Sequence, residues 1–242
     1  MCDCRQNRGH VLSRRSLVLG GATLLTLTCG GRPLRALPLP AEARSAPNDI
    51  GGDEALARLM AGNARYQADL PGPTCLSACR AAIATRQYPI AAMVCCSDSR
   101  VAPELVFDQD GGQIFVVRVA GNIVDTDGIA SLEYAVRELN VPLLLVVGHA
   151  RCGAVTAAVN VVRDKIEVPG HLTSLVNQIR PAVDAAAPLG GDLLANAIIL
   201  NARTSARKIA DSAPILAPAI AGGRVKLATA IYDLASGAVT LV

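Results

Sequence analysis

The chain has 242 residues, of which 51% are hydrophobic and 18% are charged, with no tryptophan, two phenylalanines and four tyrosines. This length and composition are typical of one globular domain with an aliphatic core, and they exclude a disordered chain. The formal net charge is only +3, which gives no electrostatic basis for binding nucleic acid.

The first 43 residues have the layout of an export signal. Residues 14–15 are paired arginines, and residues 17–31 form an uncharged, mostly apolar run. This run is shorter than the roughly 20 apolar residues that a membrane-spanning helix needs. With Ala41-Glu42-Ala43, which suits a cleavage site, the pattern predicts a signal peptide and linker over 1–43. The paired arginines favour the twin-arginine route.

This signal predicts a periplasmic protein that meets the membrane only through the export signal. An uncleaved membrane anchor is the alternative interpretation. Residues 44–242 carry 17 basic and 18 acidic side chains, so the positive net charge of the whole chain belongs to the signal. Export by this route carries folded proteins, which suits a protein that acquires a metal in the cytoplasm.

Residues 53–70 predict a helical arm at the start of a single domain over 44–242. Apolar side chains recur there near helical spacing, and acidic residues in the first turn complement the helix dipole. Short apolar runs without charge predict buried strands over 90–96 and 141–148, and a valine-rich run predicts a further strand over 113–119.

Further helices are expected over 74–87, 128–139, 151–162, 171–186 and 191–210. The last residues predict a strand, a turn at Ser236-Gly237 and a second strand, which form an antiparallel hairpin at the sheet edge. Strands that alternate with helices predict an α/β fold with a mainly parallel central sheet flanked by helices.

Three potential metal ligands follow these buried strands. Cys96 ends one strand, His149 follows another, and Cys152 comes three residues later at a helix start. Because ligands bind outside the carboxyl ends of parallel strands, we expect the three side chains to meet. Thiolate and imidazole suit zinc, and three protein ligands leave the fourth tetrahedral position open for water, as in catalytic sites.

Other interpretations of these residues stay open at this point. A buried cysteine often serves as a small apolar side chain, and two cysteines of an exported protein can form a disulfide. The pattern Cys96-x-Asp98-x-Arg100 favours the metal site. Asp98 can accept a hydrogen bond from metal-bound water, and Arg100 can hold that carboxylate bidentately and keep it ionised. An ordinary surface ion pair is the alternative.

The two patterns C-x-D-x-R and H-x-x-C, with their flanking sequence, resemble the signature of the β-class carbonic anhydrases. The resemblance covers about residues 53–242 and includes GNARY at 62–66, CSDSRVAPE at 96–104, FVVRVAGNIV at 115–124, LEYAV at 132–136, GHARCGAV at 148–155 and YDLASGAV at 232–239.

The resemblance implies an enzyme (carbonate dehydratase, a lyase) that hydrates CO2 reversibly to bicarbonate and a proton by metal-bound hydroxide. It implies one Zn²⁺ per subunit on Cys96, His149 and Cys152, with Asp98 orienting the hydroxide and Arg100 securing Asp98. In some members of the family this ion pair breaks and the aspartate displaces the water from the metal.

The resemblance also implies a substrate pocket and an oligomer. The pocket residues are Gln87, a donor to substrate oxygen, the backbone N–H of Gly153, and the wall residues Phe115, Ala120 and Tyr134. Because the glutamine and the phenylalanine come from a partner subunit in the family, a homodimer or a dimer of dimers is expected. Some members have an inhibitory bicarbonate site with a tryptophan where this chain has Met93, so Arg118 lacks that partner and we expect no such inhibition.

Two alternative functions remain: hydrolysis of CS2 or COS on the same scaffold, and a zinc-binding protein without turnover. Several other residues are interpreted as structural. Cys75 and Cys79 are expected to be free thiols, with a disulfide as the alternative, and Cys95 to be a core thiol facing away from the ligands. Asp125 and Asp127 are expected to be turn or capping residues. His171 is expected to have a structural role, with a proton shuttle as the alternative.

Overall fold

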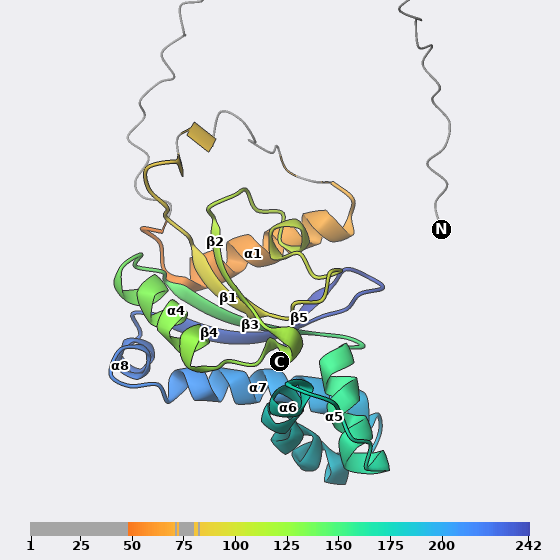
Figure 1. Ribbon diagram of the computed structural model, residues 1–242. Helices are drawn as coiled ribbons and strands as arrows, with labels where there is room; N and C mark the ends of the chain where they lie inside the picture. The colour runs from red at the N-terminus through yellow and green to blue at the C-terminus, as the bar shows by residue number, and fades with distance from the viewer. Residues whose placement is uncertain (1–47, 71, 73–79, 82) are drawn as a thin grey trace, which may run out of the picture. The chain divides into compact units, whose positions relative to one another are not determined.

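The computed structural model describes residues 48–70, 72, 80–81 and 83–242 (Figure 1). Within them, one sheet has the strand order β2-β1-β3-β4-β5. Strands β1 to β4 are parallel and β5 runs antiparallel to β4 at the edge, which confirms the predicted fold class. The strands are β1 (Ala91–Cys95), β2 (Ile114–Arg118), β3 (Leu143–His149), β4 (Lys226–Tyr232) and β5 (Val239–Leu241).

The central strands are buried on both faces. Every residue of β1 and β3 is buried, which explains why the sequence of these strands lacks charge. The register places Cys95 beside Arg118 of β2 and Val147 of β3. The carboxyl ends of β1, β2 and β3 therefore lie together at one edge of the sheet.

Helices cover both faces of the sheet (Figure 1). Helix α1 (Gly52–Gln67) packs on one face, where its Ala55 and Leu59 are fully buried, so the predicted helical arm lies against its own sheet. The opposite face is covered by α4 (Thr126–Arg137), α7 (Leu193–Ala210) and α8 (Leu216–Ala221). A third apolar cluster joins α5 (Gly153–Asp164) and α6 (Leu172–Ala186) to α7.

The helix boundaries differ from the predicted ones for local reasons. Helix α4 begins earlier than expected because the Asp125 carboxylate caps it, accepting from Gly128 N at 2.8 Å. Helix α5 begins later because Arg151 takes a left-handed conformation with φ 55°. The short helix α3 (Pro103–Val106), α8 and the 3₁₀ turns η1 (Ala120–Asn122) and η2 (Ala187–Leu189) were not predicted.

The helix expected over 74–87 falls largely outside the described residues. Its predicted end is wrong, because residues 84–87 are not helical. Pro89 follows closely, and proline restrains the residue before it from helical conformation. Among the described residues, no helix is long and apolar enough to cross a membrane.

Candidate metal centre

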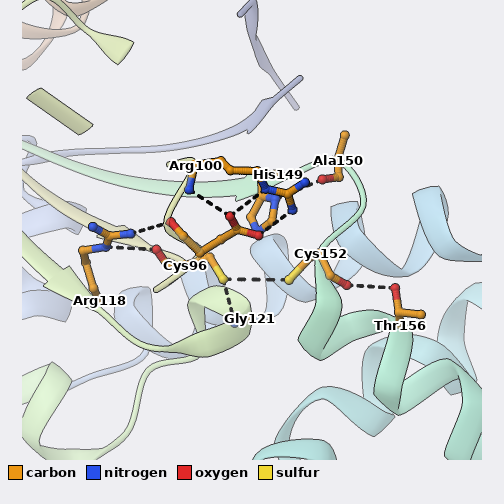
Figure 2. A network of polar contacts seen from close by, with 9 residues as sticks. Cys96, Arg100, Arg118, Gly121, His149, Ala150, Cys152 and Thr156 are labelled. Carbon is orange, nitrogen blue, oxygen red and sulfur yellow. Dashed lines mark hydrogen bonds and ion pairs between the residues drawn. The ribbon is translucent and has the colours of Figure 1, made fainter. Parts of the chain in front are cut away.

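The three predicted ligands meet at the carboxyl edge of the sheet. Cys96 follows β1 directly, His149 is the last residue of β3, and Cys152 is the N-cap residue of α5. One ligand atom from each lies within 4.8 Å of the others, and all three residues are buried. Figure 2 shows the side chains converging from three separate segments. The parallel strands and the left-handed turn at Arg151 create this meeting point.

The two thiols are spaced for a shared ion rather than for a disulfide. The Sγ atoms of Cys96 and Cys152 lie 3.9 Å apart, and both cysteines are free. Two thiolates on one tetrahedral ion, with metal–sulfur bonds of about 2.3 Å, would lie about 3.8 Å apart. The hydrogen bond from Cys152 holds the pKa of Cys96 well below the ordinary thiol value, whereas that same bond and burial raise the pKa of Cys152. A cation between them would relieve the cost of ionising both.

His149 presents one particular nitrogen to the centre. Its Nδ1 lies 2.9 Å from the carbonyl oxygen of Ala150. Because a carbonyl only accepts, Nδ1 carries the proton and Nε2 has the free lone pair. Nε2 is buried and has no hydrogen-bond partner among the described residues. An orphaned lone pair beside two thiols fits a metal ligand whose orientation is fixed by its second nitrogen.

The predicted ion pair borders the same site. Arg100 donates from Nε to Oδ1 of Asp98 at 2.9 Å and from Nη2 to Oδ2 at 2.7 Å, and its backbone N–H donates to Oδ1 at 3.0 Å. This hydrogen bonding holds the pKa of Asp98 well below its usual range. Oδ2 of Asp98 lies 3.9 Å from Nε2 of His149, so an ionised carboxylate faces the ligand group.

Two further contacts at this site were not predicted. Arg118 donates from Nε to the carbonyl of Cys96 at 3.0 Å and from Nη2 to the carbonyl of Asp98 at 2.7 Å (Figure 2). The backbone N–H of Gly121 donates to Sγ of Cys96 at 3.2 Å. The end position of Arg118 on a strand beside β1 could have indicated the first contact. The Gly-Asn pair after that strand, typical of left-handed turns, could have indicated the second.

The predicted substrate residues fall into two groups. Ala120 is half-buried in η1 beside Gly121, and Gly153 is exposed as the first residue of α5, next to Cys152. Gln87 and Tyr134 are exposed and line a different cavity of about 530 Å³. Phe115 packs against Tyr134, with ring centroids 6.3 Å apart. Within one chain, the cavity of the second group is not lined by the metal ligands.

Several residues are interpreted from the sequence as structural rather than catalytic. Cys95 is fully buried in the core on the α1 side of the sheet, away from Cys96, and burial raises its pKa to about 12. Asp125 caps α4 and Asp127 lies in its first turn. His171 occupies the N-cap position of α6, but its side chain makes no capping hydrogen bond. Cys75 and Cys79 lie outside the described residues.

The fold and the site together define an α/β protein with a candidate metal centre of two cysteines and one histidine. The family model described as "Carbonic anhydrase" matches residues 91–239. The chain is 35% identical over 185 residues to a carbonic anhydrase of Mycolicibacterium smegmatis, and this match covers 76% of this chain and 89% of that protein. The chain therefore belongs to the carbonic anhydrase family.

Other relatives agree with this assignment. Carbonic anhydrase 2 of Mycobacterium tuberculosis is 44% identical over 126 residues, which cover 52% of this chain and 61%, less than two thirds, of that relative. Two solved β-carbonic anhydrases share the fold. The Coccomyxa enzyme has a TM-score of 0.60 at 26% identity, covering 78% of this chain and 82% of that one. CcaA has a TM-score of 0.57 at 27% identity, covering 78% and 92%. These neighbours assign the chain to the β class.

Proposed function

We propose that this protein is a zinc-dependent carbonic anhydrase that hydrates CO2 reversibly to bicarbonate and a proton. The observation that carries the proposal is the placement of an ion-paired carboxylate, Asp98, 3.9 Å from Nε2 of His149 in a buried Cys-His-Cys group. Among the described residues, this Nε2 has no hydrogen-bond partner. A purely structural metal site needs no such carboxylate. Family membership supports the same reaction.

Cys96, His149 and Cys152 would hold the metal. Two thiolates and one imidazole are a donor set that zinc prefers. Zinc held by such ligands supplies a Lewis acid that lowers the pKa of bound water to about 7. The carbonyl of Ala150 contributes by fixing the tautomer and orientation of His149.

Asp98 would orient the attacking group through one particular oxygen. Its Oδ1 already accepts two hydrogen bonds from Arg100, whereas Oδ2 accepts one. A carboxylate oxygen has two lone pairs, so Oδ2 retains one acceptor site on the side of His149. Because the pKa of Asp98 is held low, the carboxylate is ionised, and this oxygen can accept a hydrogen bond but cannot donate one. The carboxylate therefore selects an orientation in which a lone pair, not a hydrogen, faces the substrate carbon.

Backbone geometry supports binding of the developing bicarbonate. Gly153 is the first residue of α5, and its N–H has no acceptor within the helix. The positive end of the helix dipole lies at this point, where it stabilises developing negative charge. An alanine Cβ at position 153 would meet nothing within 4 Å, so Gly153 borders open space. Half-buried Ala120 would line the opposite wall.

We propose that the working unit is a homodimer or a dimer of dimers. Gln87 and Tyr134 line a cavity apart from the ligands of their own chain, and Phe115 packs against Tyr134. This arrangement supports their use in the site of a second subunit. Gln87 of the partner subunit would then donate to substrate oxygen. Gln87→Ala should raise KM for CO2 with zinc content unchanged. A monomer with full activity in analytical ultracentrifugation would contradict this proposal.

The decisive experiment measures zinc content and stopped-flow CO2 hydration for the wild type and Asp98→Ala. We expect about one zinc per subunit in both proteins and activity largely lost in the variant. A wild type with full zinc but no turnover would identify a non-catalytic zinc protein. Faster sulfide release from CS2 or COS than CO2 hydration would identify the alternative hydrolase.

We also propose export to the periplasm by the twin-arginine route, on the basis of the paired arginines before an apolar run. Replacing residues 14–15 with lysines should retain the protein in the cytoplasm. Equal amounts of wild type and variant in a periplasmic extract would contradict this route.

A further inference from the structure

Helix α7 carries three polar side chains that bond to the loop following β2. Asn201 and Ser205 are only 2% and 5% exposed, in a helix whose other buried residues are almost all aliphatic. Buried polar groups of this kind are costly unless they are hydrogen-bonded. Their partners therefore indicate what the helix is required to hold.

The partners are three backbone carbonyls of a single loop. Asn201 donates from Nδ2 to the carbonyl of Gly121 at 2.7 Å, Ser205 donates from Oγ to the carbonyl of Asn122 at 2.9 Å, and Lys208 donates from Nζ to the carbonyl of Val124. The three donors are four and then three residues apart, so they lie on one face of the helix. We call them the α7 donor row.

The loop they hold has an unusual backbone and a direct contact with a metal ligand. Gly121 and Asn122 both take left-handed conformations, with φ 73° and 47°, which for a non-glycine residue need support from the surroundings. In this conformation the N–H of Gly121 donates to Sγ of Cys96. The carbonyl and the N–H of Gly121 thus connect Asn201 to the thiolate ligand.

We infer that Asn201, Ser205 and Lys208 are positioning residues of the metal centre, which fix the loop so that the N–H of Gly121 stays on Cys96. This inference rests on the proposed metal site. A hydrogen bond to a thiolate ligand fixes its direction and reduces its negative charge. Losing a hydrogen bond to a metal ligand of this kind commonly weakens metal binding about 10- to 100-fold.

The test compares Asn201→Ala and Ser205→Ala with Thr204→Ala in the full-length protein. Thr204 lies on the same helix, is exposed, and bonds only to the carbonyl of Leu200 within the helix. Zinc affinity is measured by competition with a chromophoric chelator, and the thiolate-to-metal charge-transfer band is recorded after Co²⁺ substitution. We expect at least tenfold weaker zinc binding and a shifted band in Asn201→Ala. Ser205→Ala should show a smaller effect, which Ser205→Thr restores.

Each result decides the inference. The inference is overturned if Asn201→Ala and Ser205→Ala have the zinc affinity and the spectrum of Thr204→Ala. A lower melting temperature in these variants would then show only a structural role for the α7 donor row. If Asn201→Ala does not fold, Ser205→Ala and Ser205→Thr decide on the same two readouts. A wild type that binds no zinc would instead overturn the proposed function, so the two failures are distinguishable.

Discussion

Replacement of Gly121 by alanine should destabilise the protein through two separable effects. The residue has φ 73°, and a left-handed conformation costs an L-residue about 1–2 kcal/mol. An added Cβ would also lie 2.7 Å from Cδ1 of Ile179 and 3.2 Å from Cβ of Ala154. Overpacking of this kind costs about 1–3 kcal/mol. The sum is a loss of about 2–5 kcal/mol in the free energy of unfolding.

Urea unfolding of the zinc-loaded protein measures this loss, and a second substitution separates its parts. Ile179→Val removes the clashing Cδ1 and alone should cost about 0.5–1.5 kcal/mol. In the Gly121→Ala background the same change should cost nothing or stabilise, because it relieves the contact at 2.7 Å. The backbone cost should remain in the double variant.

Gly111→Ala is the matched control. A Cβ at position 111 would meet nothing within 4 Å, and its φ lies outside the left-handed range, so its unfolding free energy should stay within about 1 kcal/mol of the wild type. Additive costs of Gly121→Ala and Ile179→Val would refute the steric part of the reasoning. A Gly121→Ala variant as stable as Gly111→Ala would refute both parts.

Three further predictions concern charge and metal. Arg100 holds the pKa of Asp98 below its unfolded value of about 3.9. The ion pair therefore makes its full contribution to the free energy of unfolding above that pH, and this contribution is lost as the pH falls through the folded pKa. In urea unfolding of the metal-free proteins, Asp98→Asn should therefore be less stable than the wild type near pH 6, and a gap that does not narrow towards pH 2 would contradict this. Metal removal by a chelator should lower the melting temperature, because it leaves two thiols 3.9 Å apart without a shared cation; readdition of zinc should restore it, and an unchanged melting temperature would argue against a metal in the triad. Bicarbonate should not inhibit CO2 hydration cooperatively at lower pH, because Met93 is buried and Arg118 donates its hydrogen bonds to the carbonyls of Cys96 and Asp98. Bicarbonate inhibition that Arg118→Met abolishes would contradict this prediction.

The convergence of the three candidate metal ligands could be predicted because sequence pattern and topology coincide there. Cys96 and His149 each end a buried apolar run, and parallel strands bring such ends to one edge. Asp98 and Arg100 lie within four residues of Cys96, so their ion pair could also be predicted from local sequence spacing. Local patterns of this kind survive errors of one or two residues in the predicted helix ends.

The hydrogen bonds that hold the loop beside Cys96 could not be predicted, because their donors are side chains and their acceptors are backbone carbonyls far away along the chain. Asn201 and Gly121 are 80 positions apart, and a carbonyl acceptor leaves no residue type to recognise. In the sequence, Asn201 and Ser205 are polar residues of a predicted helix that would suit its exposed face equally well. Their burial becomes informative once the loop is in place. The candidate metal ligands are therefore recognisable by chemistry, whereas the residues proposed to orient them are recognisable by position alone.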